Sequence, residues 1–364
     1  MNDELSPEDS FRLQVLFSQD LKAVRLDEGT MTLYALTATG EASMPLAPNC
    51  RADKYARLIR EQLSGQALGS PGGYPVHLSR WTRHGQMEGL NLGKLLLTGE
   101  PEAVVAVVHS PALTDELARY AWWTQPTIEN ARLMLRREAV ARGPMGTVLA
   151  EFLAEHLPFL QEDNLAVMDT VAVLIYSRAL SPEKLEATWK RGKRTNSHYV
   201  AFLELAGWDE PYPLPSPLSP HPDLAQAETA RDQGVSGASA LCRAFGGEGQ
   251  AFLAACAEIL DRPETQEVIS RTLNAMGRYF SAGMAAPAPE PPQDHPQAAR
   301  LQAAIRLAQA NEEPLRDIFA RSTAIGSLMR RKIEPVTAPL LQDIQLLLGE
   351  SKTGARRRPS FKAQ

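Results

Sequence analysis

The sequence predicts a mostly α-helical protein, a helical bundle or stacked helix pairs, with a small N-terminal α+β unit built on a three-stranded antiparallel meander. From residue 91 to 207, apolar residues recur every three or four positions, which is the period of amphipathic helices. Before that region, the stretches 23–27, 31–36 and 41–46 are typical of short strands, because glycine-containing pairs separate them. No repeat of fixed period is found, so a regular solenoid is not specifically predicted.

The N-terminal unit is expected to begin with a helix at Ser6. Ser6 precedes Pro7 and two acidic residues, and a serine N-cap followed by proline is typical of a helix start. A second helix is expected after the meander. The residues expected to face the core are Phe11, Val15 and Leu16 in the first helix and Tyr55, Leu58, Ile59 and Leu63 in the second.

Two proline-rich segments divide the rest of the chain. Six prolines fall within 211–222 and five within 285–296. Proline breaks helices and central strands, so both segments are expected to be extended connections. The expected parts are a small α+β unit (1–69), a helical core (70–210), a Pro-rich connection (211–222), a helical segment (223–283), a Pro-rich linker (284–296), C-terminal helices (297–350) and a basic tail (351–364).

Helices are expected to resume near Asp223. The pattern Asp261-Arg262-Pro263-Glu264 predicts a helix start of the capping-box type, and a regular apolar stripe follows it. The C-terminal part is expected to hold helices over 298–309, 314–329 and 339–348. The residues of the stripe are Ile269, Leu273, Met276 and Phe280.

The composition excludes a wholly disordered chain. Hydrophobic residues make up 44% and charged residues 22%, close to the average for globular proteins. The net charge of −5 indicates neither nucleic acid nor a membrane as the partner of the whole molecule. The residues from 297 onward carry twelve basic and six acidic side chains, so a basic C-terminal arm on an acidic body is the main charge asymmetry.

A cytoplasmic location is expected. The three cysteines, Cys50, Cys242 and Cys256, include no Cys-x-x-Cys pair, which favours free thiols over a disulfide framework. The acidic N-terminal stretch has neither the basic nor the apolar region of a signal peptide. No apolar run approaches the roughly 18 residues that a membrane span needs, so no membrane association is expected.

Common catalytic motifs are missing. The sequence has no P-loop, no strand followed by a dinucleotide-binding glycine pattern, no zinc-binding His-Glu-x-x-His and no nucleophile elbow. Gly246-Gly247-Glu248-Gly249 lies between helical stretches and is better explained as an interhelical turn. His156 lies on an apolar stripe, so we expect a hydrogen-bonded core histidine. No catalytic residue, no cofactor and no metal ligand is therefore predicted.

The glycine-rich segment 70–85 combines turn formers, aromatic residues and bases. It could bind an anion or a protein partner, and the plainer interpretation is a packed loop with solvated bases. Trp122 and Trp123 adjoin on one expected helix, so they point about 100° apart; we expect one in the core and the other at an interface. The candidate interaction residues are His77, Arg80, Trp81, Arg83, His84, Trp122 and Trp123.

A second basic cluster spans residues 189–199. Its four bases, flanked by aromatic residues, could grip phosphates while the rings stack on nucleobases. The alternative is a helix end whose cations face the helix dipole, with Gly192 as the cap and the next helix beginning at Thr195. The tail 351–364 holds five bases and no acid and is expected to be mobile. The candidate anion or nucleic-acid contacts are Lys190, Arg191, Lys193, Arg194, Arg356, Arg357 and Arg358.

Four strings carry a family resemblance. They are LGSPGGYPV at 68–76, SRWTR at 79–83, LTGEPEAVV at 97–105 and TDELARYAWW at 114–123. Together they resemble the family called sulfur reduction protein DsrS, over most of the chain and most strongly from 66 to 206. Members of that family accompany the dissimilatory sulfite reductase genes of sulfur-oxidising bacteria. The resemblance implies a cytoplasmic accessory or regulatory protein of sulfur oxidation, and it carries over no active-site residue.

The preferred function is therefore a non-catalytic accessory or regulatory role, exercised through protein–protein contacts. The first alternative is a nucleic-acid-associated regulator that uses the second basic cluster and the basic tail. The second alternative is a small-molecule enzyme with an unrecognised site. The sequence does not predict the oligomeric state or the identity of a partner.

Overall fold

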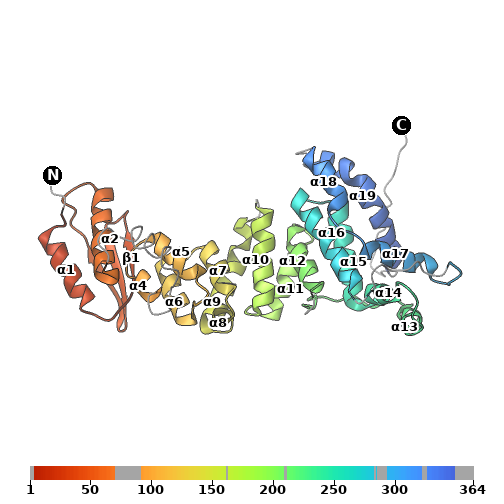
Figure 1. The fold of residues 1–364 in the computed structure, drawn as a ribbon, viewed down its shortest axis with the longest axis horizontal. Helices are drawn as coiled ribbons and strands as arrows, with labels where there is room; N and C mark the ends of the chain where they lie inside the picture. The colour runs from red at the N-terminus through yellow and green to blue at the C-terminus, as the bar shows by residue number, and fades with distance from the viewer. Residues whose placement is uncertain are drawn as a thin grey trace. The chain divides into compact units, whose positions relative to one another are not determined.

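The computed structural model describes residues 4–69, 92–160, 163–208, 211–282, 284, 293–321 and 326–348. The described chain is mostly helical and has a small three-stranded antiparallel sheet near the N-terminus, which confirms the predicted fold class (Figure 1). Contacts divide the chain into two compact units. Unit 1 comprises Met1–His156 and Ser177–Leu180, and unit 2 comprises Leu157–Tyr176 and Ser181–Gln364.

The sheet of unit 1 is the predicted meander. Its order is β1 (Leu21–Asp27), β2 (Thr32–Thr37) and β3 (Gly40–Pro45), and both pairings are antiparallel. Arg25 pairs with Tyr34, which pairs in turn with Ser43. The helices of unit 1 are α1 (Pro7–Phe17), α2 (Ala52–Leu68), α4 (Leu92–Leu95), α5 (Pro101–His109), α6 (Asp115–Thr124), α7 (Ile128–Leu135), α8 (Glu138–Ala141) and α9 (Pro144–His156).

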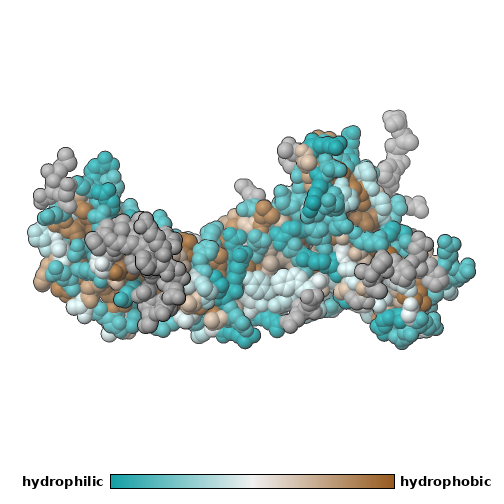
Figure 2. All heavy atoms as spheres, in the orientation of Figure 1, coloured by the Kyte–Doolittle hydropathy of each residue, from teal (hydrophilic) through white to brown (hydrophobic). Residues whose placement is uncertain are grey.

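Helix α1 begins as predicted but turns a different face to the core. The Ser6 hydroxyl accepts the Asp9 amide hydrogen at 3.2 Å, which is the expected N-cap. Leu16 is buried as expected, and Leu13 is buried beside it. The prediction for Phe11 and Val15 was wrong, because these side chains are 66% and 46% exposed. Apolar atoms accordingly appear among hydrophilic ones on the surface of unit 1 (Figure 2).

A buried carboxylate explains this orientation of α1. The Tyr55 hydroxyl donates to Asp9 Oδ2 at 2.5 Å, and the Ala47 amide donates to the same oxygen at 3.0 Å. Residues 9, 13 and 16 lie on one helical face, so the bond from Tyr55 on α2 turns that face inward. Around it, Leu13, Val24, Leu33 and Ile59 join α1, the sheet and α2 in one apolar core.

Unit 2 is built from helices and their connections. Its aromatic core includes Phe252, which stacks on Tyr279 at 4.0 Å between ring centroids and meets Phe280 edge-on. The elements are the 3₁₀ helix η2 (Leu157–Leu160), most of α10 (Asn164–Ser177), α11 (Pro182–Arg191), α12 (Ser197–Ala206), α13 (Leu224–Asp232), α14 (Ala238–Phe245), α15 (Gly247–Asp261), α16 (Gln266–Ser281), α17 (Ala298–Ala308), α18 (Glu313–Ala320) and α19 (Gly326–Leu347).

Helix α16 carries the predicted apolar stripe, whose four residues are all buried. Its predicted start was wrong. The N-cap is Thr265, whose hydroxyl accepts the Val268 amide hydrogen at 3.3 Å, and the helix begins at Gln266. The Glu264 carboxylate instead accepts hydrogen bonds from the first residues of α12. A partner distant in the sequence therefore competes with the local capping pattern.

Helix α19 runs through two prolines. Two helices are present over this region, as predicted, but their predicted bounds were wrong: α18 ends at Ala320, and α19 runs from Gly326 to Leu347 with Pro335 and Pro339 inside it. Each proline removes one amide donor and leaves the carbonyl four residues earlier without its helical partner. Both prolines are exposed, while Ile333 and Ile344 are buried. The interrupted bonds therefore lie on the side of α19 where water can replace them.

Candidate functional site

Two groups of predicted site residues lie outside the described residues. They are His77, Arg80, Trp81, Arg83 and His84 in the first cluster, and Arg356, Arg357 and Arg358 in the tail.

The two adjacent tryptophans of α6 diverge as predicted, but both are only partly buried. The Trp122 ring meets Phe152 of α9 edge-on, with 4.7 Å between centroids. The Trp123 indole N–H donates to Glu41 Oε2 at 3.1 Å. Neither ring is a fully buried core residue, so the expectation of one core tryptophan was wrong.

Trp123 belongs to a cluster on the sheet. The Arg25 guanidinium lies over both the Tyr34 ring and the Trp123 ring, 4.7 and 4.8 Å from their centroids, and pairs with Glu41 at 3.1 Å. Cation–π contacts of this kind are worth about 0.5–1 kcal/mol at partly exposed sites. A cavity of about 250 Å³ opens beside Arg25 and Tyr34. The contacts of Trp123 with Arg25 and Glu41 hold α6 against the sheet. Within the described residues, Trp123 therefore has a structural role.

His156 is hydrogen-bonded, as predicted. Its Nδ1 lies 2.8 Å from the Phe152 carbonyl oxygen, and its ring stacks on the Phe152 ring at 3.9 Å. The imidazole is half-buried rather than fully buried.

The second basic cluster forms the turn between α11 and α12. We call Lys190, Arg191, Lys193 and Arg194 the basic turn; all four side chains are exposed. Lys190 pairs with Glu186 at 2.7 Å. Within the described part of the chain, no carboxylate lies at ion-pair distance from the other three cations. Three unpaired positive charges therefore lie within four consecutive positions.

The backbone beneath the basic turn is firmly held. Gly192 follows α11 as predicted, and the reason is space: a Cβ at Gly192 would lie 2.5 Å from the Tyr199 ring. The next helix begins at Ser197 rather than at Thr195. The Asn196 and Ser197 amides donate to the Glu264 carboxylate at 2.8 and 3.1 Å. A carboxylate therefore already occupies the amide groups that an anion could use at this helix start.

The aromatic residues beside the basic turn are inside the protein. Trp189 and Tyr199 are only 7% and 3% exposed, and their rings meet edge-on at 4.5 Å. Of the two interpretations of this cluster, stacking on nucleobases is therefore contradicted, whereas the helix end capped at Gly192 is observed. The basic turn therefore presents exposed positive charges to a partner, whereas the Trp189 and Tyr199 rings are buried.

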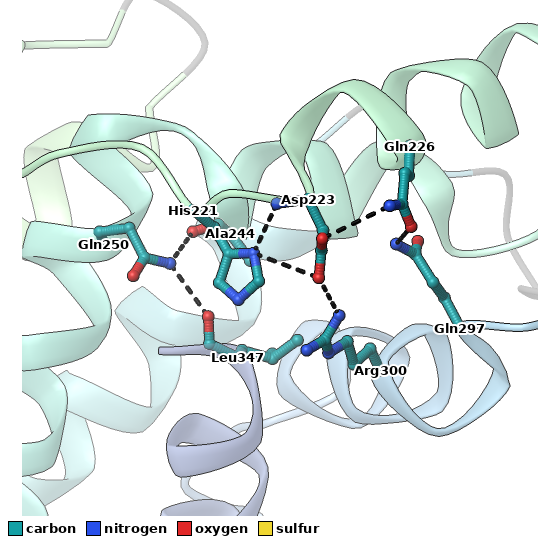
Figure 3. Close-up of polar contacts among 8 residues, drawn as sticks. All are labelled: His221, Asp223, Gln226, Ala244, Gln250, Gln297, Arg300 and Leu347. Carbon is teal, nitrogen blue, oxygen red and sulfur yellow. Dashed lines mark hydrogen bonds and ion pairs between the residues drawn. The ribbon is translucent and has the colours of Figure 1, made fainter. Parts of the chain in front are cut away.

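Sequence reasoning missed a polar network in unit 2. His221 is 7% exposed, stacks on Phe245 at 3.9 Å, and accepts the Asp223 amide hydrogen at Nδ1, 3.0 Å away. Asp223 Oδ2 accepts a hydrogen bond from Arg300 of α17 at 2.5 Å (Figure 3). The network also includes the side-chain amides of Gln226 and Gln297, while the nearby Gln250 amide donates to the Ala244 and Leu347 carbonyls.

The two helix starts in this network have a signal in the sequence. His221-Pro222-Asp223 precedes α13, and His295-Pro296-Gln297 precedes α17. In both, the histidine Nδ1 accepts the amide hydrogen two residues later, at 3.0 and 3.1 Å. The two helix starts are joined because Gln226 bonds both Asp223 and Gln297 (Figure 3). A recurring His-Pro-x pattern before helices is thus a local signal for a histidine-capped start.

Other features bear on the chemistry of the described residues. None of their His, Cys, Asp and Glu side chains form a group of three or more that could hold a metal ion. No described helix is both long and apolar enough to cross a bilayer. A cavity of about 860 Å³ lies beside Asn274, Gly277 and Arg278. All three cysteines are free, and burial raises the pKa of the Cys256 thiol.

Comparison with known proteins identifies no relative: no protein-family model, no curated protein and no solved structure matches the chain. The family resemblance of the four sequence strings therefore stays a prediction.

Proposed function

We propose that this chain is a non-catalytic accessory or regulatory protein that works through protein–protein contacts, with the basic turn as the docking point for an acidic partner surface. The observation that carries the proposal is the set of three exposed cations, without a carboxylate partner among the described residues, on a firmly held backbone. Such a patch attracts an oppositely charged surface and fixes its orientation. The likeness to the DsrS strings supports a cytoplasmic role in dissimilatory sulfur oxidation.

The firmly held backbone of the basic turn favours binding, because it loses little conformational entropy when a partner binds. The turn is tied through Asn196, whose side-chain amide donates to the Arg262 carbonyl at 2.7 Å, and through Glu264. Only the side chains of the three cations lose freedom when a partner binds. A preorganised backbone reduces this entropic cost of association.

The proposal is tested by neutralising the three cations together, as Arg191→Gln, Lys193→Gln and Arg194→Gln. The tagged full chain and this variant are used to capture partners from native extract, and the captured partner is then purified and titrated. We expect the neutralised variant to bind the purified partner more weakly, mainly through slower association, and wild-type binding to weaken with salt.

The control replaces three exposed arginines that are each already paired with a glutamate four residues away, as Arg57→Gln, Arg142→Gln and Arg316→Gln. It removes the same total charge from elsewhere. Equal losses in the two triple variants would contradict docking at the basic turn. Unchanged affinity in the neutralised variant would also contradict it.

The second candidate is nucleic-acid association, which the same three unpaired cations favour. It predicts that the full chain binds labelled RNA or DNA with an affinity that falls steeply with salt. Three phosphate contacts correspond to a log–log slope of about −3 on duplex DNA, at roughly −0.9 per phosphate. Anisotropy titrations of the wild type and the neutralised variant separate this candidate from the first.

A further inference from the structure

We propose that His221, Asp223 and Arg300 form a proton-operated latch that fastens the start of α13 to α17, closed while the imidazole is neutral and opened when it is protonated. The proposal does not depend on the function proposed above. Its basis is the buried hydrogen-bond geometry around His221 (Figure 3).

The closed state requires a neutral imidazole. His221 Nδ1 lies 3.0 Å from the Asp223 amide nitrogen, and that amide is a donor. Nδ1 must therefore carry a lone pair, so the proton is on Nε2. The ring has little freedom to turn away, because it is stacked on Phe245 at an interplanar angle of 11°, and the His221 amide donates to the Phe245 carbonyl at 2.8 Å.

Protonation places a hydrogen on Nδ1, in addition to the one on Nε2, and makes the contact with the Asp223 amide repulsive. A carboxylate acceptor for this hydrogen is Asp223 Oδ2, 3.9 Å from Nδ1. That oxygen already holds the Arg300 guanidinium at 2.5 Å. A protonated His221 therefore competes with Arg300 for one carboxylate oxygen, and the α13–α17 tie loosens as the exchange takes place.

The surroundings set the pH range of the latch. Burial lowers the pKa of His221 below its ordinary value of 6.5, the Arg300 charge lowers it further, and Asp223 opposes both. These two residues, from α17 and from the start of α13, are the charged groups that face the imidazole. The groups drawn beside it from α14, α15 and α19 are uncharged (Figure 3). The latch is therefore closed near neutral pH and opens as the pH falls below 6.5.

The chain supplies its own control in His295. Its Nδ1 accepts the Gln297 amide hydrogen at 3.1 Å in the same His-Pro-x arrangement, but its side chain is only half-buried. No carboxylate partner of His295 is present among the described residues. A variant at His295 removes a similar cap without touching the Asp223–Arg300 pair.

The test measures amide hydrogen exchange at Asp223 in the full-length protein across a pH series, after correction for the intrinsic exchange rate. In the wild type we expect protection to fall by up to tenfold per pH unit below 6.5, because one proton is taken up on opening. In His221→Asn, the asparagine oxygen can accept the same amide in an Asx turn without titrating, so protection should be independent of pH. His295→Asn should behave like the wild type at Asp223.

Two further measurements need no change at His221. Nitrogen chemical shifts of the wild-type imidazole should report the Nε2–H tautomer at neutral pH and a pKa below 6.5. Arg300→Gln removes a positive charge and a competitor for Asp223, so it should raise the pKa of His221. An Nδ1–H tautomer, a pKa at or above 6.5, or pH-independent protection at Asp223 in the wild type would each overturn the latch.

Discussion

Asp9 and Tyr55 show how a single buried polar pair orients an element. The Asp9 side chain is inaccessible, and its Oδ2 receives both the Tyr55 hydroxyl and the Ala47 amide. A buried carboxylate without partners is costly, whereas hydrogen bonds to a charged group recover much of that cost. Burial raises the pKa of Tyr55, as does its bond to Asp9, so the hydroxyl stays a donor at neutral pH.

We expect Tyr55→Phe to lower the free energy of unfolding by about 1–3 kcal/mol, because the buried carboxylate loses its closest donor. Urea denaturation at neutral pH measures the change. Tyr34→Phe is the control, since that hydroxyl has no hydrogen bond to the described residues and its ring keeps the contact with Arg25. Equal destabilisation by the two variants would show that the hydrogen bond from Tyr55 to Asp9 makes no specific contribution to the free energy of unfolding.

A second buried histidine should make the stability pH-dependent. Burial lowers the pKa of His198, the bond from its Nδ1 to the Thr195 carbonyl partly offsets this, and the Arg191 charge lowers it again. As the pH falls below the ordinary value of 6.5, the unfolded chain takes up the proton first, so the folded state loses stability.

We therefore expect the wild-type free energy of unfolding to fall between neutral pH and about pH 5, by at most about 1.4 kcal/mol per pH unit for this histidine. His198→Gln should show a smaller fall when both proteins are unfolded by urea at each pH. A fall of equal size in His198→Gln and the wild type would rule out this role for His198.

At the scale of helices, the approach of α16 to the end of α17 depends on Gly277. A Cβ at Gly277 of α16 would lie 2.0 Å from the Ala310 carbonyl oxygen, just after α17. Non-bonded heavy atoms do not approach each other this closely. The Ala310 carbonyl belongs to the backbone, so it cannot move aside as a flexible side chain would. Gly277 therefore sets how closely α16 approaches the end of α17.

Gly277→Ala should destabilise the protein by about 1–3 kcal/mol, since the backbone must shift to admit the methyl group. Gly65→Ala in α2 is the matched control, because nothing lies within 4 Å of the position where its Cβ would be. Alanine should stabilise that partly exposed helical site by about 0.5–1 kcal/mol. Thermal unfolding that shows the same sign for both variants would contradict the role of Gly277.

Helix starts that depend on neighbouring residues were predictable. Ser6, Thr114 and Ser181 each accept an amide hydrogen three residues later, as their sequences suggest. The start predicted near Glu264 failed, because its carboxylate bonds α12 across 67 and 68 residues. The continuity of α19 through Pro335 was missed for a related reason: only tertiary packing shows which face is exposed.

The candidate sites also divide into features that neighbouring residues predict and features that depend on tertiary packing. The basic turn was predictable, because its four bases fall within five positions of the sequence. The burial of Trp189 and Tyr199 was not, since that depends on how α11 and α12 pack. The His221 network requires Arg300, which lies 77 residues from Asp223, and no local pattern reveals such a pairing.

At the scale of the whole molecule, contacts are concentrated within two units. Each unit has its own buried core, with Tyr55 and Ile59 in unit 1 and Phe252 and Phe280 in unit 2. Separate cores allow separate opening, because local stability follows local burial.

We expect Tyr55→Phe to raise hydrogen exchange in peptides from unit 1 and to leave peptides from unit 2 unchanged. Gly277→Ala should have the opposite pattern. Exchange followed by mass spectrometry under native conditions makes the comparison. If either variant raised exchange evenly across both units, the chain would unfold as one cooperative body.

The cap that Glu264 provides to α12 has a consequence for the newly made chain. Glu264 is synthesised 68 residues after Asn196. At about 5–20 residues per second, that interval lasts about 3–14 seconds. Until it ends, the first amides of α12 have only water as their partner, and the backbone beneath the basic turn lacks its anchor. A messenger truncated before codon 264 would yield a chain in which this helix start is never completed.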